Sequence, residues 1–366
     1  MRHAVGYDSY SSERRMWASR GEGQSGGGRV AVRYRPHRRA GGTSMSNENC
    51  AIRVGQADVQ AVRYVHKPNT TRELRGVAGD DAAVAAAAGW AMRDAVGVQA
   101  TLSWLKKYPG QKRRAEICFH DDLRAYGWIT ASDRPRLTWD GSNALDVLSR
   151  TIGADRTSET VRFLHQHATI DANSRVLDVG CSMGHILRSV AARRPLRAVG
   201  VDNDLFALHV AALSKSGPLS AREPEWWCAN AVRLPFGDGE FTHGLSFVTL
   251  NHLPVRASLR ELARVIQPGG QLIASVEGEG FWRYKWRLGD PIRRIHLMRE
   301  RLGGAVLLYA DWQRIPVLRR LSRRVYFSMA DLKQLLPEAG FAIERCEALW
   351  EEQGAPWAIG IAARRK

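Results

Sequence analysis

The sequence has no long hydrophobic segment. A helix that crosses the roughly 30 Å apolar core of a bilayer needs about 20 apolar residues. The longest apolar run here, residues 82–92, is short and mostly alanine. The first residues also lack the apolar core of a secretory signal peptide. The sequence therefore argues against a transmembrane protein.

Cysteine is scarce, and its spacing argues against two kinds of small scaffold. The five cysteines lie far apart and form no CxxC pair; they are Cys50, Cys118, Cys181, Cys228 and Cys346. This spacing disfavours a zinc ribbon and a disulfide-stapled domain. His165 and His167 have no second ligand pair nearby, so we expect no metal site. A reducing cytoplasm is the simplest setting.

Acidic residues are too few to balance the basic ones. The 366 residues include 54 Lys and Arg against 37 Asp and Glu, which gives a formal net charge of +17. Residues 1–44 hold nine Arg against three acids, and residues 281–324 hold twelve Arg or Lys against three acids. These two segments carry most of the excess, which indicates an anionic partner or surface.

Residues 1–44 are rich in Arg, Gly and Ser and almost lack aliphatic side chains. Such a segment buries too little apolar surface to offset the entropy lost on ordering. We therefore expect a disordered, solvated basic tail. An organellar transit peptide and a nucleic-acid-binding arm are alternative interpretations of the same composition.

Residues 45–140 are predicted to form a mixed, largely helical region, and no motif in them indicates a role. An alanine-rich helix is expected over residues 80–107, where Tyr108-Pro109-Gly110 ends it. A second helical stretch is expected over residues 144–167, with a break at Gly153.

From Ser174 the chain alternates short apolar runs with helical patterns. The expected strands lie at residues 175–179, 198–202, 244–248 and 271–276, and the helices between them near 184–194, 204–214 and 256–267. This alternation is typical of βαβ units, which form a parallel sheet covered on both faces. Ligands of such sheets bind beyond the carboxyl ends of the strands.

The first of these strands ends in a glycine loop, Val176-Leu-Asp-Val-Gly-Cys-Ser-Met-Gly184. Gly180 permits a tight turn and a close approach of the backbone to a ligand, and Gly184 lets the next helix pack near the strand. Asp202 ends the second strand, where its carboxylate can accept two hydrogen bonds from a ribose diol.

Four ordered motifs resemble class I S-adenosylmethionine-dependent methyltransferases of the small-molecule, type 11-like kind. They are the glycine loop, Val199-Gly-Val-Asp202, Asn230-Ala-Val-Arg-Leu-Pro-Phe236 and Leu259-Arg-Glu-Leu-Ala-Arg-Val-Ile-Gln-Pro-Gly-Gly270, and Leu335 to Phe341 fits as well. The resemblance implies an α/β, Rossmann-like fold with a seven-stranded, mostly parallel sheet and helices on both faces. It places a methyltransferase domain at 141–366, preceded by a helical N-terminal extension, with edge strands near 342–346 and 357–363.

The resemblance implies S-adenosylmethionine as the cofactor. Asp178 and the loop residues Gly180, Cys181, Ser182 and Gly184 would face its methionine part, and Asp202 its ribose. Asn203 or Leu205 would lie beside the adenine, Asn230 and Ala231 would read the adenine edge, and Ser246 completes the predicted set. For Cys181, the structural alternative is a small apolar filler.

Three positions depart from the family pattern. Ser182 stands where glycine is usual, Asn230 where aspartate is usual, and Thr242 where aspartate usually follows phenylalanine. Serine is small, and asparagine can still accept a hydrogen bond from the adenine amino group, so we expect weakened rather than lost cofactor binding.

A dinucleotide-dependent dehydrogenase is the competing interpretation of the glycine loop. Such an enzyme needs G-x-G-x-x-G, so that a helix N-terminus meets the pyrophosphate. The loop lacks that spacing. Asp178 would also place a carboxylate near the phosphate path, whereas it suits a cofactor that is cationic there.

Methyl transfer to oxygen or nitrogen is a direct displacement, so alignment supplies much of the acceleration and a base is needed only for poorly ionised acceptors. The candidates at strand ends are His252, which lies where the family often has a histidine near the acceptor pocket, and Glu277 or Glu279. For His252, the structural alternative is a histidine that bonds the backbone at a helix end.

A basic lid insert is predicted at residues 281–325, between the fifth strand and a helix expected at 328–339. Its opening alternates aromatic and basic residues, and its later arginines are Arg293, Arg294, Arg299, Arg301, Arg319, Arg320, Arg323 and Arg324. The mixture suits a phosphorylated or carboxylated substrate, an anionic membrane surface or RNA. A solvated helical face is the structural alternative.

We therefore expect a cytoplasmic enzyme that methylates a small or lipid-linked, anionic acceptor and contacts anionic membrane surfaces peripherally. One alternative is an RNA methyltransferase that grips nucleic acid with residues 1–44 and the insert, although no RNA-binding motif is present. The other is a catalytically silent binding protein that retains the fold, which the three departures suggest.

Overall fold

The computed structural model describes residues 52–54, 81–110, 119–152, 158–191, 193–214, 223–309, 324–352 and 354–366. Several sequence-based predictions lie outside these residues: the basic tail at 1–44, most of the region 45–80, Cys50, Cys118, Arg319, Arg320 and Arg323.

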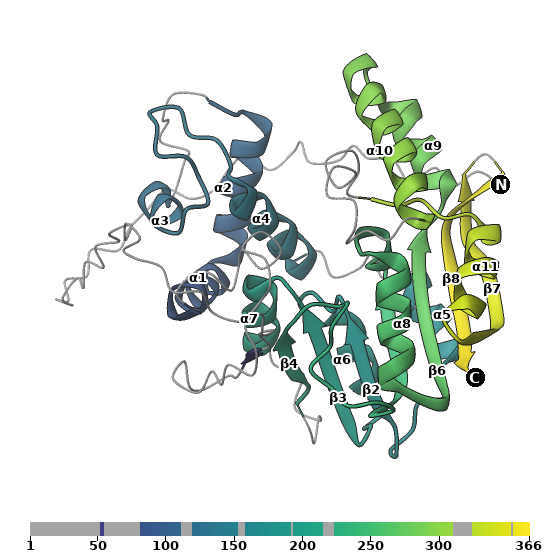
Figure 1. Cartoon of the computed structure of the whole chain (residues 1–366). Coiled ribbons are helices and arrows are strands. Elements are labelled where there is room, and N and C mark those ends of the chain that lie inside the picture. Colours follow the sequence, from purple (N-terminus) through teal and green to yellow (C-terminus); the bar gives the residue numbers. More distant parts are fainter. Residues whose placement is uncertain are drawn as a thin grey trace, which may run out of the picture. The chain divides into compact units, whose positions relative to one another are not determined.

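An eight-stranded sheet is the centre of the described structure (Figure 1), with the strand order β1-β4-β3-β2-β5-β6-β8-β7. The strands are β1 (Ile52–Val54), β2 (Arg175–Val179), β3 (Arg197–Asp202), β4 (Glu225–Cys228), β5 (Phe241–Phe247), β6 (Ile266–Glu277), β7 (Phe341–Glu352) and β8 (Ala355–Arg365). Strands β4, β3, β2, β5 and β6 run parallel, and β8 and β7 pair antiparallel at one edge. The predicted α/β, mostly parallel seven-stranded sheet is thus confirmed.

Two strands were not predicted. The short β1 pairs antiparallel with β4 and adds an eighth strand at the edge opposite β7. Strand β4 has only four residues, Glu-Trp-Trp-Cys, of which Trp226 and Cys228 are buried. It is too short to show a periodicity of its own.

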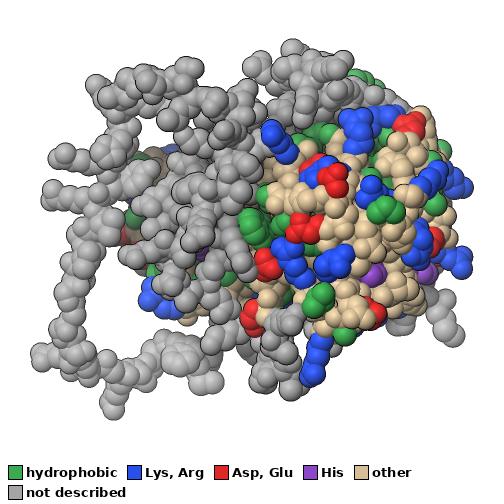
Figure 2. Space-filling view, turned by 60° about the horizontal axis from the view of Figure 1, so that its bottom comes forward, with side chains coloured by type: hydrophobic (Ala, Val, Ile, Leu, Met, Phe, Trp, Pro, Cys, Tyr) green, Lys and Arg blue, Asp and Glu red, His purple; other side chains and the backbone are tan. Residues whose placement is uncertain are grey.

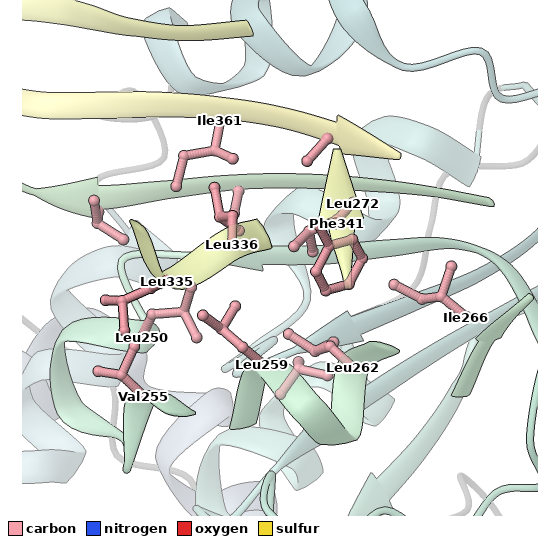
Figure 3. Packing of buried hydrophobic residues seen from close by; sticks show 14 of the residues in the cluster. Leu250, Val255, Leu259, Leu262, Ile266, Leu272, Leu335, Leu336, Phe341 and Ile361 are labelled. Carbon is pink, nitrogen blue, oxygen red and sulfur yellow. The ribbon is translucent and has the colours of Figure 1, made fainter. Parts of the chain in front are cut away.

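Helices cover both faces of the sheet. On one face lie α8 (Val255–Val265) and α11 (Met329–Glu338), and on the other α5 (Ser158–His167), α6 (His185–Ala191) and α7 (Leu205–Leu213). Helix α8 buries Val255, Leu259 and Leu262, which recur at helical spacing. Figure 3 shows these side chains beside those of α11 and of the strands β6, β7 and β8.

The helical N-terminal region differs from its prediction in one respect. The helix expected over residues 80–107 is two helices, α1 (Asp81–Arg93) and α2 (Ala95–Lys107). Asp94 separates them because its side chain accepts a hydrogen bond from the Gly97 amide and caps α2. Helices α3 (His120–Ala125) and α4 (Trp139–Ile152) follow.

Two helices follow the carboxyl end of β6. They are α9 (Glu279–Leu288) and α10 (Pro291–Tyr309), and Figure 1 shows them beyond the end of that strand. The first part of the predicted insert is therefore helical. No helix among the described residues has the length and apolar character needed to cross a bilayer.

Many basic side chains of the described domain are paired with acids. Ion pairs join Arg197 to Glu225 and Glu240, Arg264 to Asp238 and Glu261, and Arg364 to Glu344. On the face seen in Figure 2, basic side chains lie among acidic and apolar ones. The excess positive charge is not gathered into one continuous patch on that face.

Candidate cofactor and acceptor site

The glycine loop is held against the end of β3 by its own main chain. The amides of Gly180 and Cys181 both donate to the Val201 carbonyl, at 2.7 and 3.0 Å. Gly180 and Gly184 have φ angles of +79° and +78°, in the left-handed region that favours glycine. The backbone therefore takes the course that the sequence predicted for a tight turn between β2 and α6.

Both glycines also lie where a side chain has no room. A Cβ on Gly180 would collide with the side chain of Thr249, and one on Gly184 with the ring of Trp226. The Thr249 hydroxyl approaches the Gly180 carbonyl at 3.4 Å. The loop is thus packed against the residues that follow β5, which brings the ends of β2 and β5 together.

Ser182 adopts the left-handed backbone conformation that glycine usually supplies at this point of the family motif. Its φ is +48°, and its amide donates to Asp202 Oδ2 at 2.8 Å. The Asp204 amide donates to the other oxygen, Oδ1, at 2.9 Å. The Asn203 amide also bonds this carboxylate. A carboxylate has about four acceptor positions, so Asp202 retains capacity for about one further donor, such as a ribose hydroxyl.

Asp178 is a buried carboxyl group beside the loop. Its side chain is 1% exposed, and Oδ2 has no hydrogen-bond partner within the described part of the chain. Burial, and then the nearby charge of Asp202, raises the pKa of Asp178 to about 8. A cationic group placed here would favour the ionised carboxylate. An anionic pyrophosphate would instead be repelled by that carboxylate.

The ends of β3 and β4 lie side by side at the predicted adenine end. The Ala229 amide donates to the Asp202 carbonyl at 3.0 Å, which brings Asn230 near Asp202. Asn230 Oδ1 accepts from the Val232 amide at 3.1 Å, and Ala231 is half-buried. Asn203 is exposed.

Leu205 and Ser246, which were predicted to bind the cofactor, and Thr242, which departs from the family pattern, lie in three different parts of the structure. Leu205 is buried in the core beneath α7. Ser246 is fully buried on β5, on the sheet face that carries α8, because Gly244, two residues earlier, faces Ile266 and Leu262. Thr242 lies near the amino end of β5 and bonds the Arg175 backbone, so its departure from the family pattern is remote from the loop.

The predicted catalytic residues lie at the ends of β5 and β6, and a buried asparagine joins these ends. Asn251 accepts from the Glu277 amide through Oδ1 at 2.9 Å. Its Nδ2 donates to the carbonyls of Glu277 and Val325, at 3.1 and 2.6 Å. Asn251 is a positioning residue that the sequence analysis did not single out, although it precedes His252.

Arg324 lies between the two predicted catalytic residues. Its Nε is 3.3 Å from Glu277 Oε2, and its Nη2 is 3.2 Å from His252 Nε2. Since arginine has only donors, His252 Nε2 is the acceptor of this contact. Glu277 is 8% exposed; burial raises its pKa, and the charge of Arg324 opposes that rise. Glu279 instead pairs with Arg301.

A second buried polar group adjoins this end of the site. Lys285 Nζ donates to the Tyr326 hydroxyl at 3.1 Å, and that hydroxyl donates to Glu300 Oε2 at 3.0 Å. Burial, and then the charge of Arg324, lowers the pKa of Lys285. These residues connect α9 and α10 to the segment 324–328 that precedes α11.

Arg150 was also not singled out by sequence. It lies at the last turn of α4, and its charge lowers the pKa of both Asp202 and Glu277, against their burial. The neighbouring Thr151 hydroxyl contacts Met183 of the glycine loop. The end of α4 thus borders both halves of the site, a relationship that no local motif reports.

Comparison with known proteins agrees with this geometry. Residues 177–274 match the family model described as a methyltransferase domain. The chain is 27% identical over 135 residues to the methyltransferase GfsG of Streptomyces halstedii, covering 37% of this chain and 47% of that protein. It is 28% identical over 208 residues to 24-methylenesterol C-methyltransferase 2 of Arabidopsis thaliana, covering 53% of this chain and 50% of that protein.

Residues 177–274 are a methyltransferase domain, and the relatives support a class I S-adenosylmethionine-dependent methyltransferase. A solved S-adenosylmethionine-dependent methyltransferase from Mesorhizobium loti is similar over 58% of this chain and 99% of its own, with 18% identity and a TM-score of 0.41. The chain spans about half the length of the curated relatives it matches.

The cofactor of a methyltransferase domain of this class is S-adenosylmethionine, and the residues present fit it. The orphaned, buried Asp178 Oδ2 is suited to the cationic methionine part. Gly180 and Gly184 carry no side chain at the two ends of the loop, and Asp202 keeps about one free acceptor position for the ribose. These residue roles stay predictions. The described residues contain no cluster that could hold a metal ion.

Proposed function

We propose that this methyltransferase transfers the methyl group of S-adenosylmethionine to a small or lipid-linked acceptor that carries an anionic group. When bound, the cofactor supplies an electrophilic methyl group on a sulfonium. The anionic character of the acceptor is inferred from one observation, the placement of Arg324 between Glu277 and His252 at the carboxyl ends of the strands. A cytoplasmic location belongs to the same proposal.

Arg324 is suited to bind the acceptor because its contact with His252 is replaceable. A carboxylate or phosphate binds a guanidinium with two parallel hydrogen bonds, which are stronger than a single contact to a neutral imidazole. An anionic acceptor would therefore displace His252 Nε2 from Arg324. Glu277 would remain at the carboxyl end of β6, where Asn251 bonds its backbone.

This exchange provides a base. Once Arg324 turns to the acceptor, the His252 Nε2 lone pair becomes available to take the proton that the acceptor atom loses as it forms its bond to the methyl carbon. The electron pair of the broken carbon–sulfur bond stays on sulfur. Alignment of the acceptor with the methyl group supplies the rest of the acceleration.

The named activities of the relatives support the broader acceptor class. One is a sterol C-methyltransferase, whose acceptor is a lipid, and another is an O-methyltransferase of Aspergillus nomiae, rstn1. Neither name specifies an anionic group. That part of the proposal rests on Arg324 alone.

The first experiment tests the activity and the cofactor site. Calorimetry of the full chain should show binding of S-adenosylmethionine, and cell extract incubated with isotope-labelled cofactor should yield a labelled product by mass spectrometry. Asp202→Ala should weaken cofactor binding by about 1.5 to 3 kcal/mol, the range for hydrogen bonds to a charged group. Cofactor binding without any labelled product would favour a catalytically silent binding protein.

The second experiment tests Arg324 with a matched control. Arg324→Gln should raise the acceptor KM at least tenfold and leave cofactor affinity within about twofold, because the loss of a charge-assisted contact costs about 1.5 to 3 kcal/mol. Arg364 pairs with Glu344 beside the amino end of β6. Arg364→Gln therefore removes a similar ion pair at the other end of the strand and should change neither the acceptor KM nor the cofactor affinity. Equal acceptor kinetics in the two variants would refute the role of Arg324.

A further inference from the structure

Helix α10 carries an apolar stripe on its exposed side. The stripe consists of Leu288 at the end of α9 together with Ile292, Ile295, Met298, Leu302 and Val306, whose exposures run from 40% for Met298 to 71% for Ile292. Residues three and four apart lie on one side of a helix, so the last four residues form a continuous row. Stable monomers rarely leave a row of this length uncovered.

The opposite side of α10 is already packed, which fixes the stripe outward. Leu297 and Leu308 are 3% and 2% exposed, and the Leu297 carbonyl accepts from Trp282 Nε1 at 3.0 Å. Glu300 accepts from the Tyr326 hydroxyl, and Arg301 pairs with Glu279. Helix α10 is therefore apolar on two sides. The domain covers the side with Leu297 and Leu308, and the stripe lies on the other side.

Basic side chains border the stripe. Residues 279–309 contain seven Lys and Arg against three Asp and Glu. Arg294 and Arg299 lie beside the row at helical spacing and are exposed, and Arg294 lies over the ring of Trp286 with its Nε on that residue's carbonyl. An apolar row flanked by arginines is the pattern of a helix that lies in the interface of an anionic bilayer.

We propose that α10 docks on an anionic phospholipid surface, with Ile292, Ile295, Met298, Leu302 and Val306 in the boundary between headgroups and acyl chains. The arginines beside the row would bind the lipid headgroups. This inference does not depend on the proposed methyl transfer, so it is measured without cofactor or acceptor.

Charge distinguishes a membrane from two other occupants of the stripe. In a symmetric dimer through α10, the arginines of one copy would lie against those of its partner, which costs energy through like-charge repulsion. Residues 310–323 follow α10 in the chain and contain four Arg against one Asp, so they share its charge sign. An anionic lipid surface complements the charge instead.

The docked helix would bring the acceptor end of the site to the lipid. Glu300 connects α10 to Tyr326 and Lys285, which adjoin Arg324 and Glu277. Figure 1 shows α9 and α10 beyond the carboxyl end of β6, where parallel strands present their ligands. An amphiphilic acceptor held in the bilayer would reach this end without crossing water.

Vesicle co-sedimentation of the full chain tests the proposal. The protein should bind vesicles of phosphatidylcholine with phosphatidylglycerol and bind those of phosphatidylcholine alone at least tenfold more weakly. Ile295→Ser with Leu302→Ser should lower binding to the anionic vesicles at least tenfold. Leu196→Ser with Leu213→Ser, which changes two exposed leucines elsewhere, is the matched control and should bind like the unchanged chain.

Charge reversal separates the two parts of the surface. Arg294→Glu with Arg299→Glu should weaken binding more at low salt than at high salt, because exposed charges are screened within about 8 Å at physiological ionic strength. Each variant should remain folded, because all four side chains changed on α10 are exposed. Circular dichroism and thermal melting check this.

Three outcomes would overturn the proposal. The first is an unchanged chain that does not bind anionic vesicles, or an Ile295→Ser, Leu302→Ser variant that binds them as well as the control. The second is a concentration-dependent dimer that this variant converts to monomer, which assigns the stripe to a second copy. The third is RNA binding that depends on Arg294 and Arg299 in a chain that does not bind vesicles.

Discussion

The amide of Ser182 donates a 2.8 Å hydrogen bond to Asp202 Oδ2, and it does so from a left-handed backbone conformation with φ +48°. The contact ties the glycine loop to the end of β3. A non-glycine residue pays about 1 to 2 kcal/mol for that conformation, so the loop is held in place against a local strain.

Ser182→Gly should stabilise the protein by up to about 1 kcal/mol. Glycine removes the left-handed strain but adds entropy to the unfolded chain, so only part of the strain is recovered. Urea unfolding measures the change. Arg194→Gly is the control, since Arg194 is exposed, also has a positive φ of 52° and lies outside the loop. Only Ser182→Gly should tighten cofactor binding; a destabilised Ser182→Gly variant would contradict the assignment of strain.

Gly180→Ala should cost more stability than Gly269→Ala. Both glycines have a similar φ, +79° and +74°, so alanine suffers a similar strain at each of about 1 to 2 kcal/mol. At Gly269 a Cβ meets no atom within 4 Å, whereas at Gly180 it collides with the Thr249 side chain. The difference in unfolding free energy, expected at about 1 to 3 kcal/mol, measures the collision. Equal costs would show that the loop can move away from Thr249.

The stability of the cofactor-free protein should fall as pH rises from 7 to 8, above the range in which His209 and His243, whose pKa values burial lowers to about 4, act in the opposite direction. The pKa of Asp178 is about 8 in the folded chain and 3.8 in the reference state, so the folded protein retains a proton that the unfolded chain has lost. When the folded state binds more protons, the unfolding free energy decreases with pH. Asp204, with a pKa of about 6, acts mainly below this window.

Asp178→Asn should flatten that decrease, because asparagine has the same shape and does not titrate. Urea unfolding at both ends of the window measures it. The raised pKa of Asp202 leaves a residual slope in both proteins. A variant that loses stability with pH as steeply as the unchanged chain would show that Asp178 is already ionised.

Cofactor affinity should increase with pH over the same window, by at most about tenfold per pH unit. A cation bound beside Asp178 favours the carboxylate, so binding releases the proton that burial retains. Calorimetry in two buffers of different ionisation enthalpy detects that proton. Asp178→Asn should bind more weakly and with a flat pH profile; a flat profile in the unchanged chain would remove Asp178 from the cofactor site.

Asn251→Ala should destabilise the protein by about 2 to 5 kcal/mol. It leaves the Glu277 amide and the Val325 carbonyl without their side-chain partner, and each buried orphan costs about 1 to 3 kcal/mol. Asn230→Ala removes one hydrogen bond of a half-buried side chain and should cost about 1 kcal/mol. A loss for Asn251→Ala no larger than that of Asn230→Ala would mean that water replaces Asn251.

The strands and helices of the sheet were predictable where a local pattern repeats. The runs at 175–179 and 198–202 are the strands β2 and β3 within one residue, and α8 and α11 lie where their apolar spacing placed them. The interruption at Asp94 was not predicted, because the alanine-rich run before it has no clear period whose end would mark a cap.

The cofactor end of the site was largely readable from sequence, and the acceptor end was not. Asp178, the glycine loop and Asp202 lie within two adjacent strand ends, so one local motif reports them. Arg324, Asn251 and Arg150 come from three distant segments, and each matters through partners 26 or more residues away, such as Glu277 for Asn251. No spacing rule connects such positions.

By itself the sequence determined the βαβ order, the glycine loop and the carboxylates at two strand ends, because these depend on contacts between neighbours along the chain. Tertiary structure alone decided that Arg324 stands between Glu277 and His252, that Asp178 Oδ2 is buried with no hydrogen-bond partner among the described residues, and that α10 turns apolar side chains outward. The physical reason is that burial and electrostatic environment are set by which segments pack together, and the packing partners of these residues lie far away in the chain.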